Sequence, residues 1–219
     1  NPGAYMQPPE VTGMASDQMA TPVHKNLLPA LNYDRRPIDQ DLTRHALTYK
    51  LTETSSVMAN EYMRLEHADG IARITFCRPE RANAINIEFA REFLQVAETC
   101  RDNPDIRVVI LASEGKLFSA GGDLASFADA GDKLPDALQE LLTAVHGAIQ
   151  ILSSMDAPVI AQVAGTVAGA GLGLVAATSF AYATVDSKFT MSFTGVGLTP
   201  DSSSSWFLPR LVGLRRAEE

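Results

Sequence analysis

The sequence contains little cysteine. Its two cysteines, Cys77 and Cys100, are too few for the disulfide framework of a small secreted domain. They also lack the paired spacing of a zinc site, so no metal is expected. This usage favours a reducing compartment, and we expect a cytoplasmic protein.

Positive charge is also in short supply. Lysine and arginine together number 18 against 26 aspartates and glutamates, which gives a net charge of −8. This balance argues against a nucleic-acid-binding protein, which would present a basic face. It leaves room for an anionic small molecule held by a few local arginines.

No secretory signal is expected, because no basic flank precedes an apolar stretch at the start of the chain. Residues 157–185 carry no charge and are long enough to span a bilayer. However, Pro158, Gln162 and several glycines interrupt this run. They favour a buried strand, a bend and a buried helix, so no membrane partner is expected.

The chain divides into two parts. Residues 1–57 contain scattered prolines without a sustained hydrophobic period, which predicts an irregular or partly disordered extension with a short helix at 39–51. Residues 58–219 alternate strand and helix patterns and predict an α/β domain with a mainly parallel sheet. The expected elements are a hairpin at 63–76, a helix from 87 to about 100, a strand at 108–112, a helix at 134–153, a strand at 159–164, a helix at 169–178 and a strand at 181–185.

Two glycine-rich bends, at 118–124 and 165–173, carry the strongest chemical signal. Each follows an apolar strand pattern and leads into a helical one, which leaves backbone N–H groups unpaired at the helix start. If both bends meet at one point, these groups form an oxyanion hole. Each donor in such a hole stabilises a transition state by about 3–4 kcal/mol.

Competing interpretations are weaker. Residues 171–176 formally fit a dinucleotide-binding fingerprint, but the fit begins inside the predicted helix and the next acid, Asp186, follows too soon. The Gly-x-Ser-x-Gly motif of serine hydrolases is absent, and the serine run at 202–205 is typical of a turn or helix cap. His146 lies between apolar residues, which favours a structural role at the core or its rim.

Four segments together resemble the enoyl-CoA hydratase/isomerase (crotonase) superfamily. They are Arg-Pro-Glu-Arg-Ala-Asn-Ala at 78–84, Phe-Ser-Ala-Gly-Gly-Asp-Leu at 118–124, Pro-Val-Ile-Ala-Gln-Val-Ala-Gly at 158–165 and the segment 197–213. The resemblance implies a ββα spiral that forms trimers or hexamers. It also implies acyl-CoA substrates, with coenzyme A as part of the substrate and no permanently bound cofactor.

The resemblance assigns roles to residues of the first three segments. The oxyanion donors would be the N–H groups of Gly122 and Ala170. The coenzyme A pocket would be lined by two loops, whose residues are Arg78, Arg81, Ala82, Ala120, Asp123 and Leu124.

The acid positions indicate which reaction to expect. Gly173 and Phe193 occupy the two positions at which hydratases of the superfamily carry glutamates, whereas Asp201 occupies the position of the single acid of enoyl-CoA isomerases. The resemblance is greatest to the phenylacetate-pathway isomerase type. It predicts α-to-γ proton transfer by Asp201 in a surround that Phe193, Trp206 and Phe207 would make apolar.

Three alternatives stay open at this stage. In the first, Asp201 would only cap the following helix. In the second, Asp201 or His146 would activate water in a hydratase or a hydrolase. In the third, the chain would bind acyl-CoA without catalysis. The resemblance also predicts glycines near Ser203 and Ser204. Further helices are expected after Glu219, so the domain is expected to be truncated at its C-terminus.

Overall fold

The computed structural model describes residues 56–218. The extension predicted for residues 1–57, with its helix at 39–51, lies outside the described residues except for Ser56 and Val57, where strand β1 (Ser56–Ala59) begins.

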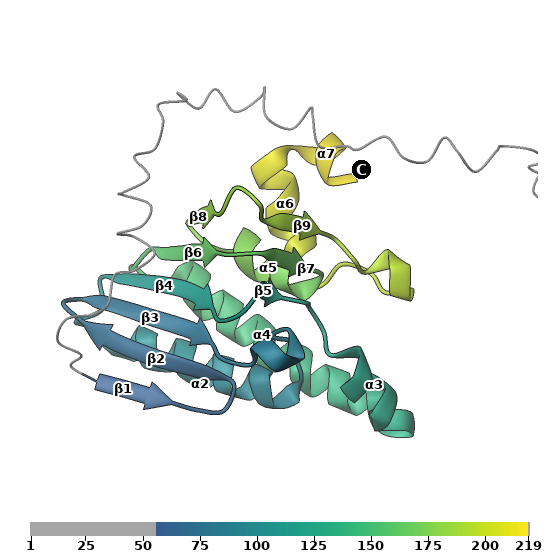
Figure 1. The fold of residues 1–219 in the computed structure, drawn as a ribbon, viewed down its shortest axis with the longest axis horizontal. Coiled ribbons are helices and arrows are strands. Elements are labelled where there is room, and N and C mark those ends of the chain that lie inside the picture. The colour runs from purple at the N-terminus through teal and green to yellow at the C-terminus, as the bar shows by residue number, and fades with distance from the viewer. Residues whose placement is uncertain (1–55, 219) are drawn as a thin grey trace, which may run out of the picture. The chain divides into compact units, whose positions relative to one another are not determined.

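A six-stranded sheet forms one layer of the domain (Figure 1), in the order β1-β2-β3-β4-β6-β8. The first three strands are antiparallel and the rest are parallel. The predicted hairpin is confirmed: Asp69 and Gly70 form its two-residue turn with φ of 54° and 79°, as a type I′ turn requires. The strands after β1 are β2 (Met63–Ala68), β3 (Ile71–Phe76), β4 (Val108–Ser113), β6 (Val159–Val163) and β8 (Phe180–Ala183).

Two long helices, α2 (Ile87–Asp102) and α4 (Leu134–Ser154), pack against each other behind this sheet in Figure 1. The predicted cap of α2 is present, since the Asn86 Oδ1 accepts a hydrogen bond from the Phe89 N–H at 2.9 Å. Both helices were expected from their apolar spacing, and both ends of each lie within two residues of the prediction.

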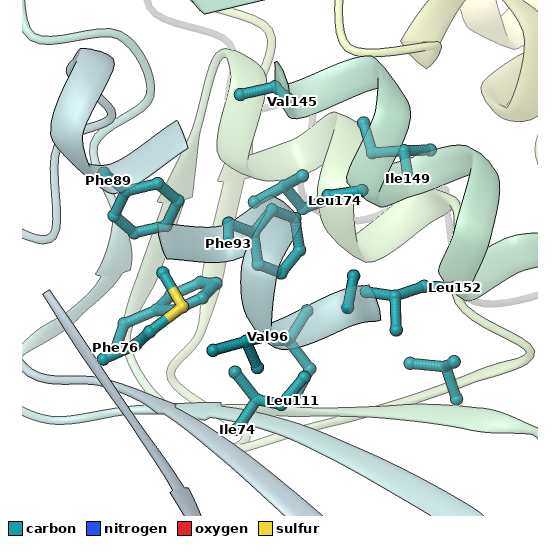
Figure 2. Packing of buried hydrophobic residues seen from close by; sticks show 14 of the residues in the cluster. Ile74, Phe76, Phe89, Phe93, Val96, Leu111, Val145, Ile149, Leu152 and Leu174 are labelled. Atoms are coloured by element: carbon teal, nitrogen blue, oxygen red, sulfur yellow. The ribbon is translucent and has the colours of Figure 1, made fainter. Parts of the chain in front are cut away.

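The core between the sheet and α2 contains four phenylalanines with edge-on contacts. The Phe76 ring lies 4.9 Å from the Phe89 ring, 5.9 Å from the Phe93 ring and 5.4 Å from the Phe118 ring, between ring centres. Figure 2 shows Phe76, Phe89 and Phe93 beside aliphatic residues of β3, β4, α4 and α5 (Ala170–Ala176). Edge-to-face pairs of this kind add to the stabilisation that burial itself supplies.

A second, three-stranded parallel sheet was not predicted. Its strands are β5 (Leu117–Ser119), β7 (Thr166–Ala168) and β9 (Lys188–Thr190), in the order β5-β7-β9. Three residues are too few for a two-residue period to emerge from the sequence. The remaining elements are α3 (Leu124–Ala130), α6 (Ser204–Val212), α7 (Leu214–Glu218) and the 3-10 turns η2 (Pro79–Arg81), η3 (Gly131–Lys133) and η4 (Thr194–Val196).

Within residues 56–218, no helix combines the length and the apolar character needed to cross a bilayer. The uncharged run at 157–185 instead contains the predicted strand, bend and helix, as β6 and α5, together with β8 and the short strand β7, which was not predicted.

Phe76→Ala should lower the free energy of unfolding by about 3–5 kcal/mol, because it removes a fully buried ring from the aromatic cluster. Urea denaturation of the full chain, followed by circular dichroism, measures the change. Phe189→Ala is the control: Phe189 is 46 % exposed, and its replacement should cost less than about 1 kcal/mol. Equal losses for the two variants would contradict this account of the core.

Candidate active site

The two glycine bends meet because the strands before them are neighbours. β5 and β7 pair in parallel, with Leu117 opposite Thr166 and Ser119 opposite Val167, so both bends begin at the same edge of the small sheet. A Cβ atom built on Gly121 would lie 2.9 Å from the Ala168 carbonyl oxygen and 3.2 Å from the Ala170 nitrogen. The two bends therefore converge, which is the condition under which their N–H groups could form an oxyanion hole.

The N–H groups of Gly122 and Ala170 are free to bind a ligand. On either side of Gly122 the backbone is engaged: the Ile85 N–H donates to the Gly121 oxygen, and the Asp123 N–H donates to the Ile85 oxygen. Ala170 is the first residue of α5, where an N–H has no partner inside the helix. Neither N–H donates to another group within residues 56–218, which suits both to an oxyanion.

The loop at 78–84 is fastened to the first bend. The Ala120 N–H donates to the Ala82 oxygen at 3.0 Å, and the Ser119 hydroxyl donates to the Asn83 oxygen at 2.9 Å. Arg78, Arg81, Ala82 and Ala120, which were assigned to one pocket from the sequence, thus lie in two joined loops.

Asn83 holds this loop in place, a role that the sequence analysis missed. It is fully buried with φ of 48°, and its Oδ1 accepts from the Arg78 N–H at 2.9 Å. Its Nδ2 donates to the Glu114 and Leu117 oxygens at 3.0 and 2.9 Å. The signal in the sequence was an asparagine between two alanines, a residue type that tolerates the left-handed conformation.

The two arginines of the loop differ in availability. The Arg78 guanidinium lies over the Tyr62 ring at 4.3 Å, its Nε lies 3.5 Å from the Glu80 carboxylate, and its side chain is only 16 % exposed. Arg81 is exposed at the end of η2. Of the two, Arg81 is the side chain that can reach an anion in solvent, whereas Arg78 braces the loop by stacking.

Asp123 and Leu124 also differ in what they can contribute. The Asp123 carboxylate caps α3, since its Oδ1 accepts from the Ala125 and Ser126 N–H groups at 3.2 Å. Leu124 is 50 % exposed and presents an apolar side chain next to the bend. Asp123 therefore shapes the edge of the site through the helix it begins.

Asp201 lies in the turn before α6. Its main-chain oxygen accepts from the N–H and the hydroxyl of Ser204, and its Oδ1 accepts from the Ser202 hydroxyl at 2.9 Å. The helix cap is Ser203, which has no side-chain capping bond, so within the described residues the Asp201 carboxylate does not cap α6. Burial raises the pKa of Asp201, while the Ser202 hydrogen bond and the nearby His146 charge act in the opposite direction.

This turn packs against α5, the helix that begins at Ala170. A Cβ atom built on Gly173 would lie 2.5 Å from the Ser202 carbonyl oxygen. Gly173 is three residues from Ala170, about one helical turn or 5 Å along the axis. The acid-bearing turn and one oxyanion donor are thus held by the same short helix.

The three residues expected to make the surround of Asp201 apolar differ in their burial. Phe193 is buried and Phe207 is half-buried against the core. Trp206, in contrast, is 58 % exposed, with the Arg210 guanidinium 3.3 Å above its ring. His146 is exposed on α4 and so does not belong to the core, although a structural role at the core or its rim was expected for it.

Sequence comparison decides the family. The family described as enoyl-CoA hydratase/isomerase matches residues 66–219. The chain belongs to the enoyl-CoA hydratase/isomerase family. The predicted resemblance is confirmed, as is the α/β fold of the crotonase type.

Members of the enoyl-CoA hydratase/isomerase family with different activities resemble this chain. The 4-chlorobenzoyl coenzyme A dehalogenase-2 of an Arthrobacter species is 31 % identical over 162 residues, 74 % of this chain and 59 % of the relative. The 1,2-epoxyphenylacetyl-CoA isomerase of Escherichia coli is 32 % identical over 155 residues, 70 % of this chain and 59 % of the relative. The crystal structure of an enoyl-CoA hydratase from Polaromonas sp. JS666 superposes with a TM-score of 0.67 at 31 % identity, covering 72 % of this chain and 61 % of that one.

The chain spans about three fifths of the length of these family members. Their names cover dehalogenation, isomerisation and hydration of acyl-CoA compounds, so the family alone does not choose among these reactions.

Gly121→Ala should force the two bends apart and destabilise the protein by more than backbone strain alone. At Gly121 the added methyl meets the Ala168 oxygen and the Ala170 nitrogen, and φ is 87°. Gly213 is a matched control, with φ of 86° and nothing within 4 Å of an added Cβ. Both substitutions carry a left-handed strain of about 1–2 kcal/mol, and Gly121→Ala should cost at least about 1 kcal/mol more. Equal denaturation midpoints for the two variants would contradict the close approach.

Proposed function

We propose that the protein is an enoyl-CoA isomerase that moves a carbon–carbon double bond from the β,γ to the α,β position of an acyl-CoA thioester. The observation that carries the proposal is a single carboxylate, Asp201, in the turn that packs against Gly173, which lies one helical turn along α5 from the unpaired backbone donor at Ala170. No carboxylate stands at the two other acid positions of the family, which hold Gly173 and Phe193.

The proposed reaction needs one group that first accepts and then donates a proton. The ionised Asp201 removes a proton from the α-carbon, and the electron pair moves into a dienolate whose charge resides on the thioester oxygen. The N–H groups of Gly122 and Ala170 bind that oxygen. The carboxylic acid then gives its proton to the γ-carbon, which restores the thioester and the carboxylate without net oxidation or addition of water.

The environment of Asp201 suits this exchange. Burial raises the pKa of its carboxyl group, which brings the group closer to the acidity of its carbon-acid partner and makes its protonated form accessible. The Ser202 hydrogen bond and the His146 charge act against this rise and favour the ionised form, which the first step requires.

Coenzyme A would bind as part of the substrate, along the joined loops. Arg81 supplies an exposed positive charge for a phosphate, and Arg78 keeps the loop in shape. The backbone of Ala82 and Ala120, with the Leu124 side chain, would line the pocket beside the helix that Asp123 caps.

We also propose that the protein forms a homotrimer or a hexamer. Large apolar side chains are exposed along the C-terminal third of the described chain, and a second copy of the chain would cover some of them. They are Phe180, Tyr182, Val185, Phe189, Val196, Leu198, Trp206, Leu211, Val212 and Leu214.

Asp201→Asn should lower the rate of isomerisation of a 3-enoyl-CoA by about 10²–10⁴-fold, because the amide cannot accept the α-proton. Binding of the CoA thioester should change little, since the oxyanion donors remain. Proton exchange at the α-carbon in deuterated water, read by NMR, isolates the first step, and Asp156→Asn is the control at an exposed site.

Product mass separates the rival activities. Isomerisation leaves the mass unchanged, whereas hydration adds one water and hydrolysis releases free coenzyme A. An active Asp201→Asn variant would refute the role of Asp201. Substrate binding without α-proton exchange in the native protein would instead support an inactive acyl-CoA-binding subunit.

Gly173→Glu should not create a hydratase. The space next to Gly173 is filled by the Ser202 backbone, which lies 2.5 Å from a Cβ built there and cannot move like a flexible side chain. The variant should lose stability and should not add water to a 2-enoyl-CoA, as measured by denaturation and by mass analysis. Water addition by this variant would show that the Ser202 backbone does not exclude a glutamate side chain at position 173.

A further inference from the structure

The buried hydroxyl of Ser202 has a defined partner. Its side chain belongs to a residue that is 1 % exposed, and its Oγ lies 2.9 Å from the Asp201 Oδ1. An ionised carboxylate is only an acceptor, so the serine hydroxyl is the donor. A hydrogen bond from a buried donor to a charged group is among the stronger ones in proteins.

The backbone at this turn adopts an uncommon conformation. Ser202 has φ of 50° and Ser203 has φ of 59°, the left-handed region that residues with a Cβ rarely adopt. The turn is held by the Ser204 N–H and hydroxyl, which donate to the Asp201 oxygen, and by its packing against Gly173. Glycine would adopt these angles without strain. A serine at position 202 is therefore strained, which is consistent with a role for its side chain.

We propose that Ser202 is a positioning residue that orients the Asp201 carboxylate and keeps it ionised for proton abstraction. The inference rests on the proposed isomerase function and adds to it a second side chain. The hydroxyl engages Oδ1, which leaves Oδ2 as the oxygen available to the substrate carbon.

Other charged groups near Asp201 are few. On α4, His146 is the titratable residue whose charge acts on the carboxylate. Neither α5 nor η4 contains a titratable side chain, and Arg210 on α6 donates to the Trp206 oxygen. Within the described residues, the Ser202 hydroxyl is therefore the side-chain donor that stabilises the ionised form.

The sign of the expected pH effect follows from this contact. The hydrogen bond favours the carboxylate and so lowers the pKa of Asp201, against the effect of burial. Without the hydroxyl, the carboxylate becomes protonated at a higher pH. The acid limb of the kcat/KM profile should then move to higher pH, because less of the base is ionised.

The test measures kcat/KM against pH for isomerisation of a 3-enoyl-CoA by the native chain, Ser202→Ala and Ser202→Gly. Each variant should lose about tenfold in kcat/KM at acid pH, and the acid limb of each variant's profile should move to higher pH. Ser202→Gly also removes the backbone strain, so it should denature at a higher urea concentration than Ser202→Ala. A shifted limb in both variants assigns the effect to the hydroxyl and excludes a loss of stability as its cause.

Ser203→Gly is the matched control. Ser203 shares the left-handed conformation, but its side chain makes no capping bond and none to the carboxylate. Its acid limb should coincide with that of the native chain.

Native-like profiles for both Ser202 variants would overturn this inference. They would leave the isomerase proposal intact if Asp201→Asn is inactive in the same assay. An active Asp201→Asn variant would overturn both proposals, so the two failures are distinguishable.

Discussion

The close approach of two backbone segments is the constraint on which the rest of the site depends. β5 and β7 are paired in parallel, so the bends that follow them leave the small sheet at the same edge. Gly121 has no side chain, and only this lets the first bend lie against the Ala168 oxygen and the Ala170 nitrogen. The free N–H groups of Gly122 and Ala170 are held there by main-chain geometry, and on the proposed function the surrounding side chains would determine the reaction of a bound carbonyl.

A fixed pair of backbone donors surrounded by variable side chains agrees with the different activities for which the relatives are named. Relatives of this chain are named as a dehalogenase, an isomerase and a hydratase, at identities between 31 % and 32 %. In this chain the side chains near the bends include one half-buried acid, Asp201, and a turn of serines that fills the space beside Gly173. On the proposed function, the chemistry of the protein would therefore depend on the turn before α6.

Long elements could be predicted from the sequence because their periods repeat. The helices α2 and α4 and the strands β2, β3, β4 and β6 were expected at nearly their observed positions. The strands β5, β7 and β9 were missed, since three residues cannot display a period and their pairing is set by tertiary contacts. The N-terminal extension was predicted from proline content, and that part of the prediction lies outside the described residues.

The parts of the site that are formed by glycine-rich backbone could be predicted from the sequence. The parts that depend on how side chains pack could be predicted less well. The two bends could be recognised from their glycines, but their meeting was only a condition of the hypothesis, and the buried Asn83 that fastens the loop at 78–84 was not assigned a role. Trp206 was expected beside Asp201, yet it stacks with Arg210 at the surface, because hydrophobicity alone does not tell which side of a helix is covered. The hydrogen bond from Ser202 likewise required three-dimensional structure.

The small sheet has an exposed outer strand. All three residues of β9 are exposed, and the Thr190 oxygen of this strand accepts the N–H of Gly169, the residue before Ala170. A short edge strand with few partners opens more readily than the centre of a large sheet. The second bend is thus held in part by an exposed edge strand, and a partner that packs on β9 would stabilise the donor at Ala170 without contacting it.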